Sequence, residues 1–108
     1  MASDLLVESG YQILTCGFRS RFGEIDIVAR DGETVVFVEV KTRTDREFGD
    51  PAEAVTPQKQ QKIVRMAEEY VMLERLENAY CRFDVVAIDL TTEPPIVNHY
   101  QDAFRPGW

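Results

Sequence analysis

The sequence is poor in the residues that several common kinds of catalysis require. Its 108 residues include two cysteines, one histidine and one tryptophan. A single histidine excludes histidine-rich zinc sites and mechanisms that need two histidines. Any enzymatic activity must therefore rest on carboxylates and lysines. The one histidine, His99, is expected to be a packed or exposed structural residue.

The two cysteines, Cys16 and Cys81, are far apart and lack the C-x-x-C spacing of a metal site. We expect both to be reduced residues of the core, which fits a cytoplasmic protein. No apolar run approaches the roughly 20 residues of a membrane span, and no signal segment opens the chain. The sequence therefore predicts one cytoplasmic domain, residues 1–108, with no membrane partner.

Basic residues are also few, twelve against nineteen acidic residues, which gives a formal net charge of −7. Phosphate binding favours a basic surface, so this total argues against a strong nucleic-acid binder. The distribution is uneven, because residues 19–65 hold nine basic and nine acidic residues, whereas residues 66–108 hold three and eight. Weak, metal-assisted binding of DNA near the first of these regions is compatible with this distribution.

The most informative stretch is residues 23–43, which read GEIDIVARDGETVVFVEVKTR. Ile25–Ala29 and Thr34–Val40 are rich in β-branched residues, and Asp31-Gly32 between them is typical of a tight hairpin turn. A two-residue turn at this dipeptide fixes the expected register. The expected cross-strand pairs are Arg30 with Glu33, Asp26 with Phe37, and Glu24 with Glu39.

Side chains alternate between the two faces of a strand, so this register divides the hairpin into an apolar face and a mixed face. The apolar face comprises Ile25, Ile27, Val36, Val38 and Val40. The mixed face comprises Glu24, Asp26, Phe37, Glu39 and Lys41. Three carboxylates and a lysine thus converge in a strand pair that is otherwise suited to a core.

A carboxylate in so apolar a strand is costly to bury unless another group compensates its charge. A divalent cation held by Asp26 and Glu39, with Glu24 beside them, would do so, because oxygen ligands suit Mg²⁺ or Mn²⁺. Lys41 lies two residues beyond Glu39, where it can contact a phosphate or activate an attacking water. The alternative is a salt-bridged surface face in which Lys41 simply pairs with a carboxylate.

Asp26 followed by Glu39-Val40-Lys41 on the next strand resembles the PD-(D/E)XK nuclease motif. In that motif an Asp and a Glu bind metal, and the Lys assists phosphodiester hydrolysis. Five further segments resemble the bacterial YraN family, small proteins likened to archaeal Holliday-junction resolvases. These segments are GEIDIVARDG, VFVEVKTR, FGDPAEAVTPQKQ, RFDVVAID and the final DAF. The resemblance covers nearly the whole chain, from Gly10 to Phe104.

This resemblance implies a Mg²⁺- or Mn²⁺-dependent endonuclease for structured DNA such as a junction, a flap or a damaged site. Asp26 and Glu39 would be the metal ligands and Lys41 the third catalytic residue. It also implies a restriction-endonuclease-like core, and a homodimer, because junction cutting needs two sites. Relatives add a glutamate from the first helix. Counting back from Gly10-Tyr11, that glutamate would precede Met1.

Two other functions stay open. The first is a nuclease-fold module that binds nucleic acid or a partner protein with weak or no catalysis, favoured by the acidic charge and the absent first-helix glutamate. The second is a carboxylate-metal hydrolase of another phosphate ester.

Four basic residues are candidates for contact with a nucleic-acid backbone: Arg19, Arg21, Arg43 and Lys59. Arg19 and Arg21 flank a serine beside an aromatic residue, and the alternative is a solvated turn. Arg43 leads into residues 44–51, a polar loop expected either to close over a substrate or to be merely exposed. Lys59 lies in the first turn of a helix and faces the sheet; the alternative is a stem that covers apolar surface.

The remaining elements complete an α/β fold with a mixed central sheet and an acidic hairpin flanked by helices. A short helix over 2–9 and a strand over 11–18 precede the hairpin. Thr56 as N-cap and Pro57 begin a helix that runs to about Asn78. Its buried stripe is expected to be Ile63, Met66, Ala67, Tyr70 and Leu73.

After that helix a strand over 82–90 is expected to lie parallel to the preceding strand, because a helical crossover separates the two. An edge strand over 96–100 and a turn over 101–104 follow. Phe104 and Trp108 are expected to cover the core. Asp84 and Asp89 are interpreted as strand-edge or cap residues.

Overall fold

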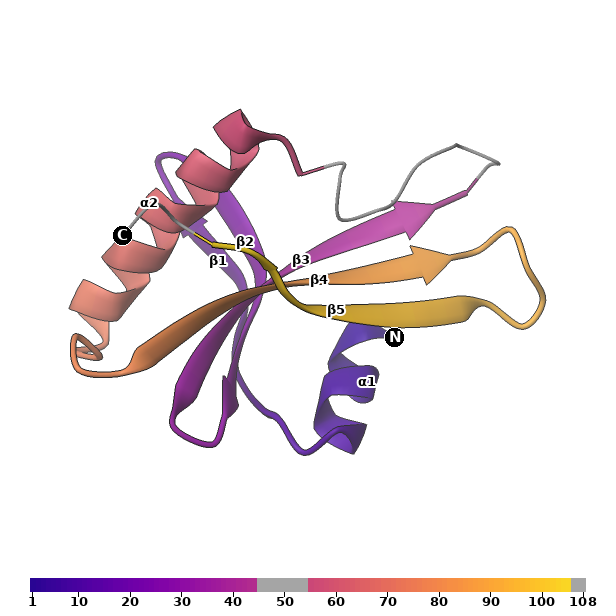
Figure 1. Cartoon of the computed structure of the whole chain (residues 1–108), viewed down its shortest axis with the longest axis horizontal. Coiled ribbons are helices and arrows are strands. Elements are labelled where there is room, and N and C mark those ends of the chain that lie inside the picture. The colour runs from indigo at the N-terminus through magenta and orange to yellow at the C-terminus, as the bar shows by residue number, and fades with distance from the viewer. Residues whose placement is uncertain (45–54, 106–108) are drawn as a thin grey trace.

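The computed structural model describes residues 1–44 and 55–105. The described residues form one five-stranded sheet that carries a helix on each face (Figure 1). The elements in chain order are α1 (Ala2–Glu8), β1 (Gln12–Ser20), β2 (Gly23–Asp31), β3 (Thr34–Arg43), α2 (Pro57–Leu73), β4 (Tyr80–Asp89) and β5 (Ile96–Phe104). No described helix is long and apolar enough to span a membrane.

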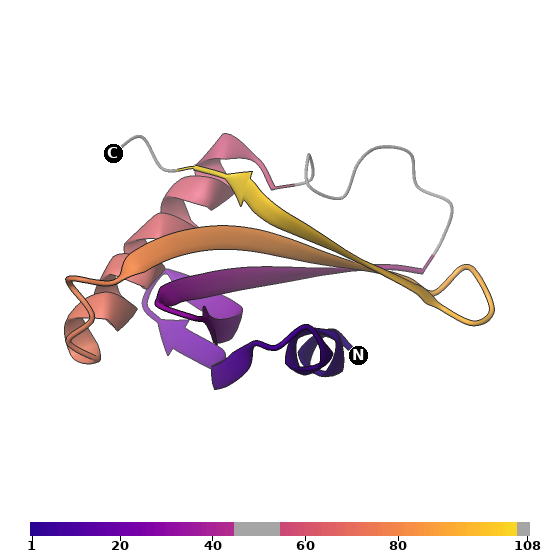
Figure 2. The same ribbon diagram turned by 60° about the horizontal axis from the view of Figure 1, so that its bottom comes forward.

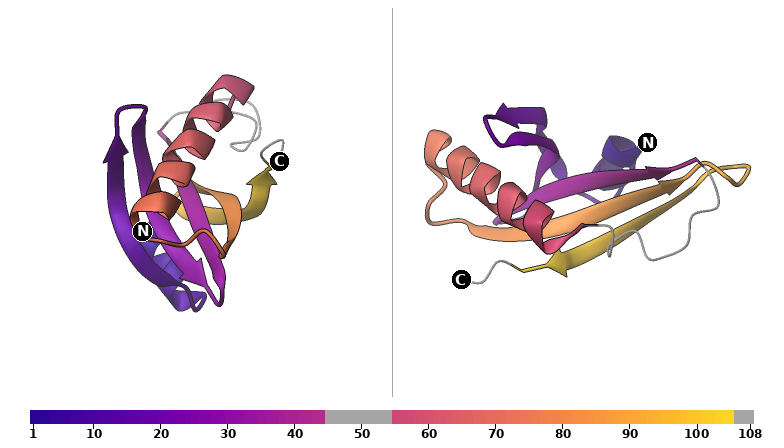
Figure 3. Two further views of the ribbon diagram at one scale, coloured as in Figure 1. Left: turned by 90° about the vertical axis from the view of Figure 1, so that its left-hand side faces the viewer. Right: turned by 90° about the horizontal axis from the view of Figure 1, so that it is seen from above.

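The spatial order of the strands follows the sequence, β1-β2-β3-β4-β5. All neighbouring strands are antiparallel except β3 and β4, which run parallel over ten paired residues and are connected across α2. This confirms the predicted mixed sheet and the helical crossover. The sheet is strongly twisted, so β1 and β5 run in very different directions (Figure 3).

Two apolar clusters hold the helices to the sheet. The cluster under α2 contains Phe37, Phe83 and Phe104, and the rings of Phe37 and Phe104 each stack on that of Phe83. The cluster under α1 contains Leu6 and Tyr11. The helices therefore lie on opposite sides of the sheet (Figure 2). Burial of Phe104 confirms its predicted role, and Trp108 lies outside the described residues.

Helix α2 begins as predicted, with the Thr56 hydroxyl accepting a hydrogen bond from the Lys59 amide at 3.2 Å. The predicted end at Asn78 is wrong, because the helix stops at Leu73 and Arg75 takes a left-handed conformation with φ of +55°. Leu73 is consequently exposed rather than buried. The other predicted stripe residues are buried: Ile63, Met66, Ala67 and Tyr70.

The β2–β3 hairpin forms, but its predicted register is shifted by two residues. Asp31 pairs with Thr34, and Gly32 takes the first central turn position with φ of +62°. The side chain of Asp31 accepts a hydrogen bond from Arg82 at 3.1 Å, which holds this residue in the strand. Phe37 therefore pairs with Val28 rather than Asp26. A shift of two leaves every side chain of the paired region on its predicted face.

One predicted face assignment is wrong. Ile25 packs in the cluster under α2, whereas Ile27 packs under α1. The pairing of β2 with β3 begins only at Ile27, and strict alternation is lost in the preceding residues, where β2 pairs with β1 alone. This separation of β2 from β3 creates the space in which the acidic residues lie.

Two further expectations need correction. β5 continues to Phe104 instead of turning after residue 100, because an irregularity opposite Asp84 accommodates Asp102 with φ of +53°. Cys16 is exposed on β1 rather than part of the core, and Cys81 is half-buried, with a thiol pKa raised by burial. Both thiols are free, as predicted. Most of the predicted loop 44–51 lies outside the described residues.

Candidate active site at the β2–β3 fork

Asp26 lies where β2 separates from β3. Its Oδ2 accepts a hydrogen bond from the backbone N–H of Val40 at 2.7 Å. The β2–β3 ladder ends at the pair Ile27 and Val38, so the Asp26 carboxylate replaces a strand partner for the next part of β3. This bond fixes Asp26 between the two strands, beside Glu39.

Glu39 forms ion pairs with two lysines from different elements. Its Oε1 lies 2.9 Å from Lys59 Nζ and 3.6 Å from Lys41 Nζ. The Glu39 side chain is only 11% exposed, whereas those of Lys41 and Lys59 are 28% and 40% exposed. Lys41 comes from β3 and Lys59 from the first turn of α2, so the structure brings three of the predicted site residues into direct contact.

The charge of Asp26 is unfavourable in this setting. Burial raises the pKa of its carboxyl, and the negative charges of Glu39 and Glu24 raise it further, against the lowering effects of the Val40 hydrogen bond and the Lys59 charge. Asp26 and Glu39 therefore repel each other across the fork. A cation between them would relieve that repulsion.

The pKa values of the two lysines that share the Glu39 carboxylate shift in opposite directions. The neighbouring Lys59 amine lowers the pKa of Lys41, and burial lowers it further. Burial lowers the pKa of Lys59, but the contacts of Lys59 with Lys41 and Glu39 outweigh this effect, so the pKa is raised overall. Lys41 is thus the more easily deprotonated of the pair, which suits a residue that accepts a proton or orients water.

Glu24 is less closely associated with this cluster than predicted. Its Oε2 forms an ion pair with Arg19 Nε at 3.3 Å, and β2 at this point pairs only with β1. Its charge still acts on Asp26. Among the described residues, no group of three or more Asp, Glu, His or Cys side chains is arranged to hold a metal ion. The fork therefore offers two carboxylates, Asp26 and Glu39, as its central pair.

Arg43 is the last residue of β3, and Arg21 lies in the β1–β2 turn. Arg43 is level with Asp89 at the end of the parallel pair, and its charge contributes to lowering the pKa of Asp89, after the larger effect of hydrogen bonds from Thr91. This confirms the interpretation of Asp89 as a capping residue. Arg21 lies in the β1–β2 turn, with its guanidinium 5.0 Å from the centre of the Phe22 ring.

Comparison with known proteins places the chain in a family. Residues 1–88 match the profile of the uncharacterised protein family UPF0102. The chain belongs to this family. UPF0102 proteins of Syntrophus aciditrophicus and Lachnoclostridium phytofermentans are 48% and 49% identical to it, over 105 and 104 residues. Those matches cover 97% and 95% of this chain, and 83% and 87% of the relatives.

A relative from Alkaliphilus oremlandii is 42% identical over 106 residues, which cover 96% of this chain and 91% of that protein. These matches support the resemblance to YraN proteins at the level of the family. The names of the family and of these relatives state no activity.

The prediction for Asp84 in this UPF0102 protein is wrong, because the residue is fully buried rather than at a strand edge or a cap. Its Oδ1 accepts hydrogen bonds from Arg82 Nε at 2.9 Å and from the Asp102 amide at 3.0 Å. Its Oδ2 accepts one from Arg82 at 3.0 Å and lies 2.7 Å from His99 Nε2. Arg82 also contacts Asp31 and the Tyr11 hydroxyl.

This network confirms that His99 is a packed structural residue. A signal for it exists in the sequence, because Arg82 and Asp84 alternate on one face of an otherwise apolar strand. The position of His99 beside them depends on the pairing of β4 with β5, which the sequence alone does not give.

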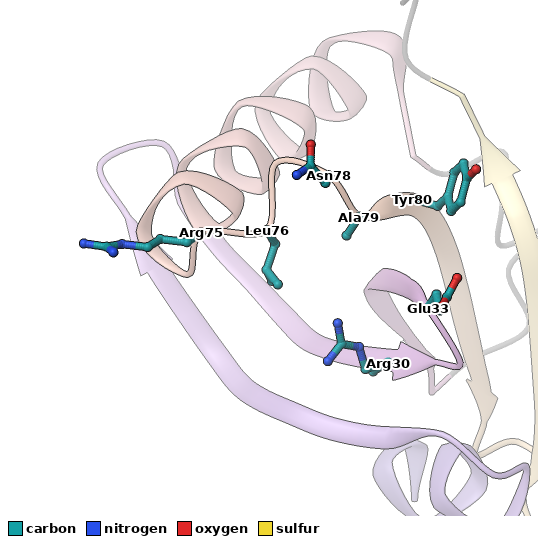
Figure 4. A pocket seen from close by; sticks show the side chains of 7 residues that line it. All are labelled: Arg30, Glu33, Arg75, Leu76, Asn78, Ala79 and Tyr80. Atoms are coloured by element: carbon teal, nitrogen blue, oxygen red, sulfur yellow. The ribbon is translucent and has the colours of Figure 1, made fainter.

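A separate hollow of about 360 Å³ lies at the other end of the sheet, between the α2–β4 connection and the β2–β3 turn. The Arg30 guanidinium points into it, whereas Arg75 projects away from the body of the protein (Figure 4). Arg30 Nε is buried and has no hydrogen-bond partner. This hollow contains none of the fork residues.

Proposed function

We propose that this UPF0102 domain is a Mg²⁺- or Mn²⁺-dependent endonuclease that hydrolyses phosphodiester bonds in structured DNA. The observation that carries the proposal is the pair of opposed carboxylates at the fork, Asp26 and Glu39, with Lys41 and Lys59 both directed at Glu39. The family resemblance agrees with this arrangement. The substrates that this resemblance implies are four-way junctions, flaps and damaged duplexes.

The residues of the fork fit a hard divalent cation. Mg²⁺ is commonly held by one or two carboxylates together with water and substrate phosphate oxygens. Asp26 and Glu39 would provide those two carboxylates, and Glu24 contributes negative charge from further away. When bound, the ion would neutralise charge that develops on the phosphate during hydrolysis.

The lysines supply the remaining chemistry in this proposal. Lys41, whose pKa is lowered, orients an attacking water and takes its proton. The water oxygen forms a new bond to phosphorus while the bond to the leaving oxygen breaks, and that oxygen takes up a proton from solvent water. Lys59 turns from Glu39 to a phosphate, and Arg43, Arg19 and Arg21 hold the adjoining backbone. A homodimer would present two such sites to a junction.

A second candidate is supported by one specific contact. Lys59 Nζ lies 2.9 Å from Glu39 Oε1, so a lysine already compensates the carboxylate that the ion would use. A protein that keeps this ion pair would bind nucleic acid or a partner protein without cutting it. The two candidates differ in whether a metal ion displaces Lys59.

A cleavage assay tests the proposal. Four-way junction, flap, duplex and single-stranded DNA are incubated with Mg²⁺ or Mn²⁺ and with wild type, Glu39→Ala or Lys41→Ala. Metal-dependent cutting that both substitutions abolish is the expected result, and an exposed control, Lys62→Ala, should cut normally. Absence of cutting by wild type, together with absence of Mn²⁺ binding in calorimetry, would leave the binding module as the function.

A further inference from the structure

The β1–β2 turn carries an aromatic ring with two guanidinium groups over it. The centre of the Phe22 ring lies 5.0 Å from the Arg21 guanidinium carbon and 5.6 Å from that of Arg65. Phe22 is half-buried against the core under α2, whereas both arginines are exposed. The three residues, which we call the Phe22 cluster, come from two elements, the turn and the middle of α2.

Neither arginine of the Phe22 cluster forms an ion pair with a described acidic residue. This is notable for Arg65, because Glu68 and Glu69 follow it by three and four residues, the spacing at which helical ion pairs normally form. Glu69 Oε2 is itself buried without a hydrogen-bond partner. Arg65 therefore contacts the ring and leaves its neighbouring carboxylates unpaired.

Stacking on a ring changes what a guanidinium can do. It limits the freedom of the side chain, and its N–H groups point outward in the plane of the group, where they can bind a phosphate. Two guanidinium groups on one ring place two phosphate-binding side chains next to each other. In a chain with a net charge of −7, two exposed arginines that form no ion pair with a described acidic residue are available to an anionic partner.

The cluster lies on the same side of the fold as the fork. Phe22, in the turn before β2, is four residues before Asp26, at most roughly 13 Å at the rise of a strand. Arg65 is six residues after Lys59 along α2, roughly 9 Å at the rise of a helix. Contact of the turn with α2 is confirmed by Gly23, since a Cβ there would lie 3.8 Å from Met66 Sδ.

We infer that the Phe22 cluster is a phosphodiester-binding site that holds the DNA strand next to the one at the fork. This inference rests on the proposed function. It adds Arg65 and Phe22 to the residues proposed to contact DNA, and it places Arg65 beside Arg21 on the same ring. Phe22 acts here as a positioning residue for the two arginines.

The test is binding of fluorescently labelled junction and single-stranded DNA to the full chain, measured by anisotropy without metal over a series of salt concentrations. Arg65→Gln and Arg21→Gln are each expected to weaken binding about three- to tenfold at low salt. Each should also reduce the slope of log affinity against log salt by about 0.7–0.9, the loss of one phosphate contact. Phe22→Leu should weaken binding less, with both charges retained.

Arg75→Gln is the matched control, because Arg75 is an exposed arginine at the end of α2 that projects away from the protein (Figure 4). It removes the same charge and should leave the slope unchanged. Wild type that binds or cuts DNA, with Arg65→Gln and Arg75→Gln showing the same slope, would overturn the Phe22 cluster and leave the proposed function standing. Wild type that neither binds nor cuts any of the DNAs overturns both.

Discussion

Lys59 Nζ contacts Glu39 Oε1 at 2.9 Å, closer than Lys41 Nζ, which lies 3.6 Å from the same oxygen. A lysine in the first turn of α2 thus reaches the E-x-K segment of β3. This contact sets the charge balance of the fork. It also divides the roles of the two lysines, because one compensates Glu39 while the other loses its proton more readily.

Removing the Asp26 charge is expected to stabilise the protein. Its pKa is raised in the fold, so the ionised form is disfavoured there at neutral pH. Asp26→Asn keeps an oxygen for the Val40 amide and should raise stability at pH 7 by about 0.5–1 kcal/mol, a modest gain because solvent screens a half-buried carboxylate. Thermal unfolding at several pH values measures this difference.

The pH dependence of that difference has a defined sign. Below the ordinary pKa of 3.8, Asp26 is protonated in folded and unfolded chains, so the advantage of Asp26→Asn should vanish. As the pH rises through the raised folded pKa, wild type loses stability relative to the variant. Asp26→Ala is the control, since it leaves the Val40 amide without its acceptor and should destabilise by roughly 1–3 kcal/mol. A less stable Asn variant at pH 7 would contradict the prediction.

Lys59→Met is expected to raise the affinity of the fork for Mn²⁺. The substitution removes the cation that competes for Glu39 Oε1 while it keeps an apolar stem of similar length. An exposed ion pair contributes about 0.5–1 kcal/mol, so calorimetry should show roughly two- to fivefold tighter binding. Lys62→Met removes the same charge from an exposed position on α2 and controls for long-range electrostatics. Equal effects of both substitutions would argue against direct competition.

The same substitution should raise the pKa of Lys41. The Lys59 amine is the largest cause of its lowered value, so its removal leaves burial as the main remaining cause. An NMR titration of the lysine side-chain ε-CH₂ groups would follow this change directly. The Lys41 midpoint should move upward in Lys59→Met and stay in place in Lys62→Met. A downward shift would show that Lys59 instead favours the charged form of Lys41.

Breaking the network around Asp84 should be strongly destabilising. Asp84→Ala leaves Arg82 and the Asp102 amide without their buried acceptor, which we expect to cost about 3–5 kcal/mol in urea unfolding. Asp84→Ala combined with Arg82→Met removes both charges together and should recover part of that loss. Strictly additive losses in the double variant would show that the two residues are not coupled.

Local chemistry determined much of the fold from sequence alone. The Thr56-Pro57 start of α2, the β2–β3 hairpin and the buried strand β4 follow from capping, turn residues and β-branched runs. The spacing of Asp26, Glu39 and Lys41 was sufficient to expect their convergence. Alternation along β3 puts Glu39 and Lys41 on one face, which the register shift of two residues preserved, whereas Asp26 lies beyond the β2–β3 pairing and meets β3 through its hydrogen bond from Val40.

Only the tertiary structure decided which side chains meet across elements. The turn lies at Gly32-Glu33 instead of Asp31-Gly32, with Asp31 held in β2 by its contact with Arg82 of β4. Leu73 is exposed because α2 ends at this residue. The choice of Lys59 over Lys41 as the closer partner of Glu39 depends on how α2 packs against the sheet. Sequence patterns report local conformation and burial, whereas such contacts depend on the relative placement of segments far apart in the chain.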